Sequence, residues 1–278
     1  MAAQTTVGLL HPGSMGAAVA ACAAANGNRV LWCPDGRSPA TSARAQQYGL
    51  EAASLEQLLA DADVLLSLCP PAAAVDVADQ VAGLGYTGVF VDANAISPTS
   101  VDRISDVFPA SAVLVDAAVV GSPPVGGKSP TLYLAGPDAA TDAVELLFAG
   151  TAVRTHVLGT EPGQASALKL AYSSFQKASR VLAALAVGVA HEHGVDQELG
   201  AIAARRSSSY LAETEYIPKT AARAWRWGPE LEEAAAMLAD AGLPPDMLTA
   251  AAATLARWDG AKDAQLSVAD ALARLATP

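Results

Sequence analysis

The sequence predicts an α/β protein in two parts, an open doubly wound parallel sheet and an all-helical region, joined by one long helix. Three observations predict this fold. Short apolar segments alternate with helical ones through residues 5–160. The stretch Gln164–Glu192 carries apolar residues on nearly every face and contains no proline. Beyond Asp196 only helical patterns follow. Alternating strands and helices are typical of a parallel sheet with right-handed crossovers.

The expected strands are short, apolar and bounded by Gly, Pro or Ser. A continuous apolar segment such as Ala62–Cys69 is typical of a parallel strand buried on both faces. Helices are expected after the first two strands, at Ser14–Ala25 and Pro39–Gln47. Ligands of such sheets bind beyond the carboxyl ends of the strands. The predicted strands are Thr5–Leu10, Asn28–Cys33, Ala62–Cys69, Gly88–Asn94, Ala112–Ala117 and Thr131–Ala135.

The long helix, Gln164–Glu192, has the all-round apolar pattern of a buried helix and would extend roughly 40 Å. Its uninterrupted apolar run, Val181–Ala190, is about half of what a bilayer requires, so we expect no membrane span. Lys169, Ser173 and Lys177 are spaced by four residues and therefore share one side of the helix. Buried cations need a partner or a ligand, so this side is either a catalytic face or one whose lysines reach solvent.

The region after the long helix is predicted to be all helical. We expect two domains, an α/β domain at 1–163 and a helical domain at 164–278. His191 and His193 diverge on a helix, so no metal site is predicted. The expected helical segments are 197–211, 213–225, 229–241, 245–257 and 264–275, with breaks at Gly228, at 242–245 and at Asp259–Gly260.

Composition excludes several classes of function. A formal net charge of −11 argues against nucleic acid as the partner. With 52% hydrophobic and 16% charged residues, the chain has the composition of a globular protein. Its three cysteines have no metal-binding spacing and indicate a reducing compartment. The Ala-rich N-terminus lacks the basic start of a signal peptide. We therefore expect a cytoplasmic protein that acts on a small molecule.

The turn after the first predicted strand indicates dinucleotide binding. The fingerprint G-x-G-x-x-G of the Rossmann fold falls on the segment HPGSMG, with histidine in place of the first glycine. The second glycine lets the backbone approach a pyrophosphate, and the third lets the helix pack on the strand. A plain strand–helix turn is the alternative. The expected cofactor contacts here are His11, Pro12, Gly13, Ser14 and Met15.

The end of the second strand bears on which dinucleotide is bound. Asp35 lies near the place of an acid that would hold the ribose 2′-hydroxyl of NAD. Beyond it come Arg37, Ser38, Thr41 and Arg44, which suit a 2′-phosphate because a guanidinium binds phosphate through two hydrogen bonds. Arg44 on a solvated helix face is the alternative. We predict NADP, with NAD possible.

These motifs, taken together, carry a resemblance to a known family. In order along the chain they are GLLHPGSMG, SLCPP (67–71), VDANAISP (91–98), VDAAVVGSPP (115–124) and GTEPGQASALKLAYSS (159–174). They resemble the β-hydroxyacid dehydrogenase superfamily, which includes 3-hydroxyisobutyrate and 6-phosphogluconate dehydrogenases and, more distantly, imine reductases. The chain is most similar to an uncharacterised NAD-binding branch with a C-terminal domain of unknown function. The resemblance covers residues 5 to about 195.

The resemblance implies roles for the long helix. The family's glycine-rich helix start matches Gly159 and Gly163, with Ala165 in place of its last glycine. Lys169 then matches the catalytic lysine, which exchanges a proton with the substrate oxygen as hydride is transferred. Ser173 stands where the family usually has asparagine. The free N–H groups of the helix start are also expected to favour an anionic group.

The resemblance also implies a substrate loop at residues 116–122 and a nicotinamide side. The loop reads DAAVVGS, in which Val120 replaces the family's substrate-binding serine, beside Gly121 and Ser122. That replacement puts the usual anchor of a small hydroxy acid in doubt. Tyr172 and Lys177 are further candidate substrate contacts, with packing as the alternative for Tyr172. The segments expected to line the nicotinamide side are Cys69, Pro70, Pro71, Asn94 and Ala95.

The predicted function is that of an NADP-dependent oxidoreductase that transfers hydride between nicotinamide and a hydroxy or carbonyl substrate. The retained Lys169 favours this chemistry over an imine reductase, because imine reductases usually lack that lysine. Two alternatives stay open: an imine reductase, and a non-catalytic dinucleotide-binding protein. From the resemblance we also expect a homodimer.

Overall fold

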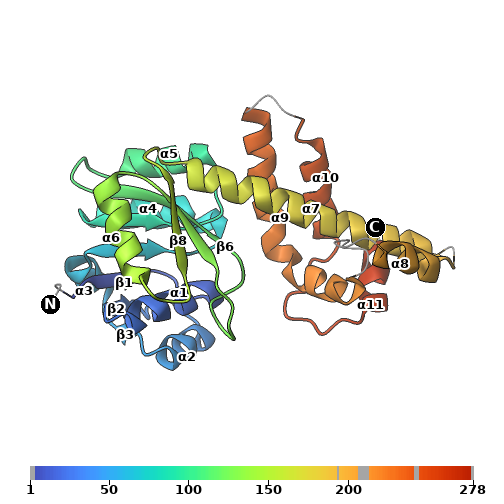
Figure 1. Ribbon diagram of the computed structural model, residues 1–278, viewed down its shortest axis with the longest axis horizontal. Helices are drawn as coiled ribbons and strands as arrows, with labels where there is room; N and C mark the ends of the chain where they lie inside the picture. The colour runs from blue at the N-terminus through green and yellow to red at the C-terminus, as the bar shows by residue number, and fades with distance from the viewer. Residues whose placement is uncertain (1–3, 193, 206–212, 241–243, 277–278) are drawn as a thin grey trace. The chain divides into compact units, whose positions relative to one another are not determined.

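The computed structural model describes residues 4–192, 194–205, 213–240 and 244–276. The chain divides into two compact units, Met1–Lys169 and Leu170–Pro278. Figure 1 shows the first as a sheet with helices on both of its faces and the second as a group of helices. Each unit is described separately below. No helix in the described ranges is both long and apolar enough to cross a membrane.

The first unit is built on an eight-stranded sheet with the strand order β3-β2-β1-β4-β5-β6-β7-β8. The doubly wound sheet predicted from the sequence is confirmed, and it is mostly parallel. All neighbouring strands pair in parallel except β6 and β7, which are antiparallel. The strands are β1 (Thr6–Leu9), β2 (Arg29–Trp32), β3 (Glu51–Ala52), β4 (Val64–Ser67), β5 (Val89–Asp92), β6 (Val113–Val120), β7 (Thr131–Ala135) and β8 (Arg154–Gly159).

The sheet differs from the sequence prediction in a strand pairing, in the end of one strand and in two strands that were not predicted. The expected parallel pairing fails between β6 and β7, because a loop without a crossover helix joins them and such a loop returns the chain antiparallel. Strand β6 runs three residues beyond the predicted end at Ala117, to Val120. Strands β3 and β8 were missed, because neither has a run of buried apolar residues.

Helices pack on both faces of the sheet and complete two apolar cores. One core joins α1 and α6 to side chains such as Val7, Leu66 and Val115 on one face. The other joins α3, α4 and α5 to Leu65 and Phe90 on the opposite face. Both faces are therefore covered, as a parallel sheet requires. The helices are α1 (Ser14–Ala25), α2 (Pro39–Gln47), α3 (Leu55–Asp61), η1 (Pro71–Ala73), α4 (Ala74–Gly83), α5 (Pro98–Val107) and α6 (Asp138–Phe148).

The long helix is present as predicted, and α7 spans Gln164–Glu192 as one element. All-round burial, however, is wrong for its first half. Leu168, Tyr172 and Phe175 are 37%, 45% and 71% exposed. They follow one another at intervals of four and three residues and therefore lie on one face of the helix, which the single chain leaves open.

Helices are the regular elements of the second unit in the residues that the structure describes, as the sequence predicts. They are α8 (Asp196–Ala204), η3 (Thr214–Tyr216), α9 (Ile217–Asp240), α10 (Asp246–Ala256) and α11 (Val268–Ala276). The last part of the expected segment 197–211, like His193, lies outside the described residues. Helix α10 and the turn at Asp259–Gly260 agree with the predicted boundaries.

The predicted break at Gly228 is wrong, because α9 continues through Gly228 and Pro229. Proline removes one helical hydrogen bond and crowds the preceding turn. Here packing outweighs that cost. Ala224, Trp227, Leu231 and Ala234 recur every three or four residues on both sides of the proline, and all are buried.

Candidate dinucleotide and catalytic site

The phosphate turn has the geometry that the fingerprint predicts. Helix α1 begins at Ser14, directly after the turn, with Gly13 as its N-cap. A Cβ atom on Gly16 would lie 2.5 Å from the carbonyl oxygen of His11, so only glycine permits this close packing. A Cβ atom on Gly13 would meet nothing within 4 Å. The turn therefore leaves open space in front of the α1 N-terminus, which fits a pyrophosphate group.

Two glycine-to-alanine variants separate packing from binding at this turn. Gly16→Ala is expected to destabilise the protein by about 1–3 kcal/mol, because the new methyl group meets the His11 backbone. Gly13→Ala is expected to keep nearly wild-type stability and to weaken dinucleotide binding, because its methyl group fills the open space. Urea unfolding and a cofactor titration measure the two effects. Equal loss of stability in both variants would contradict this assignment.

His11, at the position of the first glycine, is an uncharged group in the folded protein. Burial, and secondarily the neighbouring Arg37 guanidinium, lowers the pKa of His11 to about 4. The imidazole is therefore neutral at pH 7. Among the described residues, the buried atoms His11 Nδ1 and Arg37 Nε have no hydrogen-bond partner. Two such atoms beside the open turn are available to polar groups of a bound dinucleotide.

Two arginines that follow β2 in the chain form hydrogen bonds to backbone carbonyl groups at the phosphate turn. Arg37 Nη2 donates to the Leu10 carbonyl oxygen at 3.0 Å, and Arg44 Nη1 donates to the Pro12 carbonyl oxygen at 3.0 Å. Ser38 is the N-cap of α2, since its hydroxyl accepts from the Thr41 backbone N–H. The alternative that Arg44 lies on a solvated helix face without a structural contact is therefore wrong, because it binds the backbone of the phosphate turn. The structure brings Arg37, Ser38 and Thr41 to one place, beside the phosphate turn.

The segments after β4 and β5 are joined by one buried amide. Asn94 Oδ1 accepts from the Cys69 backbone N–H at 2.6 Å, while its Nδ2 donates to Asp92 and to the Ser67 hydroxyl. Asn94 is 2% exposed, so its side chain fixes the two loops to each other. Pro70, which follows Cys69 in the chain, is exposed.

Burial raises the pKa of two titratable groups in this network. Burial raises the pKa of the Cys69 thiol to about 12, which argues against a nucleophilic role. Burial, together with the charge of Asp116, raises the pKa of Asp92 to about 7. Asp92 and Asp116 are register partners on β5 and β6.

Asp116 forms the N-terminal cap of α7. Its Oδ2 accepts from the backbone N–H groups of Gly163, Ala165 and Ser166 at 2.8–3.0 Å, and its Oδ1 accepts from the Ser166 hydroxyl at 2.6 Å. The expectation that these N–H groups are free to attract an anionic ligand is therefore wrong for these three. A buried carboxylate already satisfies them and interacts favourably with the helix dipole.

Lys169 extends from this fixed helix start to the end of β6. Its Nζ donates to the Val119 carbonyl oxygen at 2.8 Å, and the side chain is partly buried. Val120 is the last residue of β6, and the exposed residues Gly121 and Ser122 follow it. The ammonium group is thus held at the carboxyl end of a strand, next to the loop of candidate substrate residues.

The remaining candidates belong to the second unit. Ser173, one turn after Lys169 along α7, is 3% exposed, whereas Tyr172 is 45% exposed. Lys177 is 5% exposed, forms an ion pair with Glu230 and lies 5.8 Å from the centroid of the Trp227 ring. Its charge is therefore balanced within this unit. No group of three or more metal-ligating side chains occurs in the described ranges.

Sequence reasoning missed the roles of Asp116 and Ser166. The motif around Asp116 suggested a substrate loop, but its carboxylate is turned inward to α7. The sequence did contain a signal for these roles, because Asp116 lies inside an otherwise apolar strand. A carboxylate buried there needs several hydrogen-bond donors, which a helix N-terminus can supply.

Two family models match separate parts of the chain. Residues 1–77 match the NAD-binding domain of D-isomer specific 2-hydroxyacid dehydrogenases, and residues 190–258 match a domain of unknown function, DUF1932. An uncharacterised 28.5 kDa protein of Methanothermus fervidus is 28% identical over 171 residues, which are 61% of this chain and 65% of that protein. The alignment thus spans slightly less than two thirds of this relative's length.

Solved structures with the same fold cover almost the whole chain. A conserved protein of unknown function, described as similar to 3-hydroxyacid dehydrogenases, is 26% identical, with a TM-score of 0.67 over 92% of this chain and 98% of its own. A Sinorhizobium meliloti hypothetical protein is also 26% identical, with a TM-score of 0.69 over 99% and 96% of the two chains. The 3-hydroxyisobutyrate dehydrogenase of Mycobacterium tuberculosis is 18% identical, with a TM-score of 0.74 over 99% and 100%.

The predicted resemblance to the β-hydroxyacid dehydrogenase superfamily is confirmed. The Rossmann unit followed by a helical unit is the architecture of 3-hydroxyisobutyrate dehydrogenases, and imine reductases share it. The NAD-binding family model over residues 1–77 includes the predicted dinucleotide turn, His11–Gly16.

Proposed function

We propose that this protein is an NADP-dependent oxidoreductase of the hydroxyacid dehydrogenase type, with Lys169 as its general acid and base. Residues 1–163 would bind the dinucleotide, and residues 164–278 would supply substrate and dimer contacts. The observation that carries the proposal is the position of Lys169, held at the carboxyl end of β6 by a hydrogen bond to Val119 in a sheet whose first turn fits a pyrophosphate.

The dinucleotide would be held by the first unit alone. The turn His11–Gly16 would take the pyrophosphate against the N-terminus of α1. Cys69, Pro70 and Asn94 would lie on the nicotinamide side, where Asn94 keeps the loops after β4 and β5 in fixed positions. When bound, the nicotinamide ring supplies or accepts the hydride.

Lys169 would manage the proton that accompanies hydride transfer. In the reducing direction its ammonium group donates a proton to the substrate oxygen, which gains negative charge as hydride reaches the carbon. In the oxidising direction the neutral amine removes the proton from the hydroxyl group. The bond to the Val119 carbonyl oxygen orients Nζ for either step. Ser173, Val120, Gly121, Ser122, Tyr172 and Lys177 remain candidate substrate contacts.

A substrate screen separates this proposal from its alternatives. The purified protein is incubated with NADPH and a panel of oxo acids, aldehydes and cyclic imines, and NADPH consumption is followed by absorbance. Turnover of carbonyl compounds supports the proposal. Turnover of cyclic imines alone would assign the protein to imine reduction. Cofactor binding without turnover of any compound would favour a non-catalytic dinucleotide-binding protein.

The preference for NADP is proposed to depend on Arg37. Its guanidinium lies beside the phosphate turn and the α2 N-cap, where it can meet a 2′-phosphate. Arg37→Gln is expected to weaken NADPH binding by about tenfold or more and to change NADH binding much less, as fluorescence titrations would show. Arg103→Gln, on α5, is the matched control. Equal weakening of both cofactors would mean that Arg37 only supports the turn.

A homodimer is also part of the proposal. The exposed apolar face of α7 formed by Leu168, Tyr172 and Phe175 is the kind of surface that subunit contacts cover. Sedimentation of the purified protein measures its mass, and a monomer at all concentrations would exclude the dimer.

A further inference from the structure

The second unit contains a cluster of cations around one tyrosine ring. The Arg180 guanidinium carbon lies 3.7 Å from the centroid of the Tyr216 ring, that of Arg223 at 5.5 Å, and Lys219 Nζ at 5.7 Å. Arg223 Nη1 also donates to the Tyr216 hydroxyl at 3.0 Å. Arg226 follows Arg223 by three residues on α9 and so lies on the same side of that helix. We call these four basic residues the Tyr216 cluster.

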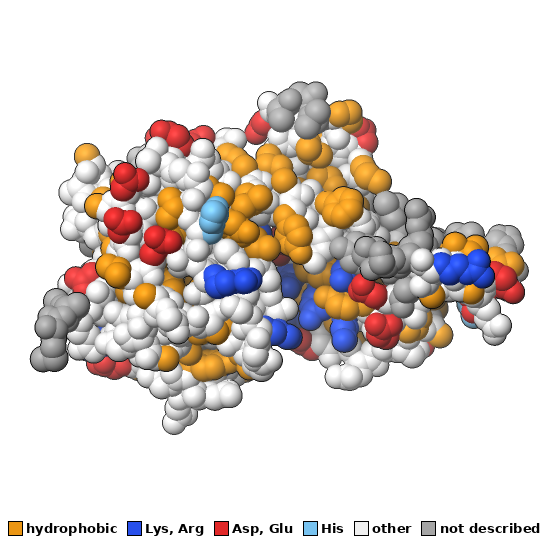
Figure 2. Space-filling model, in the orientation of Figure 1, with side chains coloured by type: hydrophobic (Ala, Val, Ile, Leu, Met, Phe, Trp, Pro, Cys, Tyr) orange, Lys and Arg blue, Asp and Glu red, His pale blue; other side chains and the backbone are white. Residues whose placement is uncertain are grey.

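Acidic side chains balance only part of this charge. Glu213 Oε2 accepts from Arg180 Nη1 at 3.0 Å. In the described part of the chain, no carboxylate lies within ion-pair distance of Lys219, Arg223 or Arg226. Among the described residues the cluster therefore combines four cations with the carboxylate of Glu213, in a chain with a net charge of −11. On the face drawn in Figure 2, several Lys and Arg side chains gather on the helical unit.

The electrostatics of the cluster disfavour the charged form of one member, Arg226. Loss of hydration against the neighbouring helices, and after it the charge of Arg223, lowers the pKa of Arg226 from its ordinary range, although the residue stays exposed at the surface. Like charges in this arrangement repel one another, and a bound anion would remove that cost. The Arg180 side chain is held by its contacts, since it is 13% exposed, stacked on Tyr216 and paired with Glu213.

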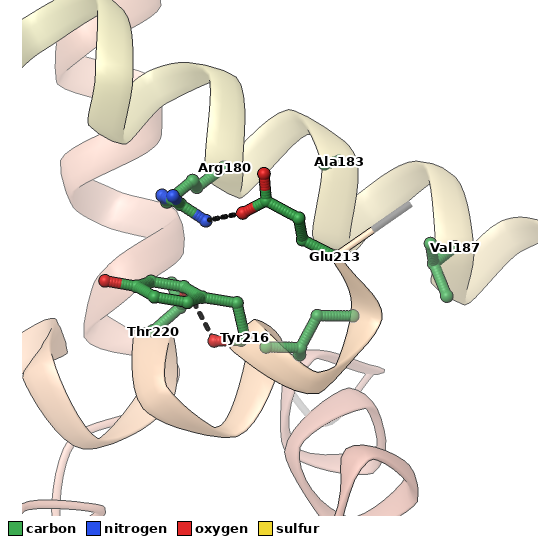
Figure 3. A pocket seen from close by; sticks show the side chains of 7 residues that line it. Arg180, Ala183, Val187, Glu213, Tyr216 and Thr220 are labelled. Atoms are coloured by element: carbon green, nitrogen blue, oxygen red, sulfur yellow. Dashed lines mark hydrogen bonds and ion pairs between the residues drawn. The ribbon is translucent and has the colours of Figure 1, made fainter. Parts of the chain in front are cut away.

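A small pocket opens at one side of the cluster, between Arg180 and the ring of Tyr216. In Figure 3 the side chains of Arg180 and Glu213 point toward each other beside the ring of Tyr216. The same three residues and Thr220 line the pocket, with Ala183 and Val187 farther along α7. Its volume is about 10 Å³, enough for one water-sized group. The pocket therefore gives one ligand atom access to Arg180, while the rest of a ligand would lie outside it, toward Arg223 and Lys219 around the Tyr216 ring.

We propose that the Tyr216 cluster binds an oxyanion, the phosphate or carboxylate group of a small molecule. The planar guanidinium groups of Arg180 and Arg223 are suited to oxyanions because each can form two parallel hydrogen bonds. Arg226 and Lys219 add charge from α9. Glu213 holds Arg180 against the ring and, as a carboxylate, competes with the ligand. This binding needs no nicotinamide cofactor and goes beyond the proposed redox function.

Calorimetric titration of the cofactor-free protein with inorganic phosphate, and separately with succinate, tests the proposal. The wild type is expected to bind at least one of them, and the tighter one identifies the ligand's charged group. Arg223→Gln should weaken binding about tenfold or more. Lys262→Gln removes an equal charge from the same unit, where Lys262 stacks on Trp225 instead, and should bind as the wild type does. Glu213→Gln should bind more tightly, because it removes the competing carboxylate.

Arg223→Gln is expected to weaken anion binding and Glu213→Gln to strengthen it. Misfolding would weaken binding in both variants, so the two effects together cannot arise from misfolding. Circular dichroism checks the fold of each variant. Absence of binding by the wild type overturns the proposal. So does an unchanged affinity in Arg223→Gln, an equal loss in Lys262→Gln, or weaker binding in Glu213→Gln. A separate NADPH titration of Arg223→Gln distinguishes this site from the dinucleotide site, because cofactor affinity should not change.

Discussion

Lys169→Ala is expected to lower the turnover rate by about 10²- to 10⁴-fold while leaving the dissociation constant of NADPH nearly unchanged. The variant removes the proton donor at the carboxyl end of β6 and leaves the phosphate turn intact. Steady-state kinetics with the best substrate of the screen and a fluorescence titration with NADPH provide the two measurements. Lys128→Ala, in the exposed loop after β6, is the matched control and should retain wild-type turnover.

Lys169→Arg distinguishes proton transfer from simple charge. Arginine keeps a cation that can still donate to the Val119 carbonyl oxygen, but its guanidinium does not lose a proton at working pH. Its turnover should therefore stay close to that of the alanine variant. Recovery of most of the wild-type rate by arginine would contradict the general acid–base role and leave Lys169 as a positive charge that positions the substrate.

Asp116→Ala is expected to reduce the free energy of unfolding by about 3–5 kcal/mol. The variant leaves the N–H groups of Gly163, Ala165 and Ser166 without their acceptor in a buried place. It also releases the Ser166 hydroxyl. Urea denaturation of the variant and the wild type measures the difference.

Asp138→Ala is the control for this cap. Asp138 also lies in the first turn of a helix, α6, but it is exposed. Its loss should cost about 1 kcal/mol or less, since an exposed acid contributes mainly through the helix dipole. If Asp116→Ala were as mild as Asp138→Ala, water or other groups would be satisfying the start of α7, and Asp116 would not be its cap.

The main elements of the fold follow from patterns within short stretches of sequence. Periodic apolar residues predict α7, and continuous apolar runs predict strands such as β4. Strand β8 has no such run, because Arg154 and His156 alternate with partly buried residues. The error at Gly228–Pro229 arose because local propensity was taken as decisive, while the buried face of α9 is a property of the folded unit.

The candidate site was predictable where one turn or one helix carries it. The phosphate turn lies in six consecutive residues, and Lys169 is placed by its position on α7. The contacts of Asp116 were not predictable in this way, because they join residues about 50 positions apart. The same holds for Arg37 and Arg44, whose bonds to the carbonyl oxygens of Leu10 and Pro12 form only when the segment 37–44 packs beside the phosphate turn.

The most direct test of the central claim is a fluorescence titration of the purified wild-type protein with NADPH and, separately, with NADH. The account predicts saturable binding of NADPH and clearly weaker binding of NADH. Tighter binding of NADH would mean that the protein prefers NAD and that Asp35 binds the ribose 2′-hydroxyl group. If neither dinucleotide binds, His11 has disabled the phosphate turn, and the proposed oxidoreductase function is wrong.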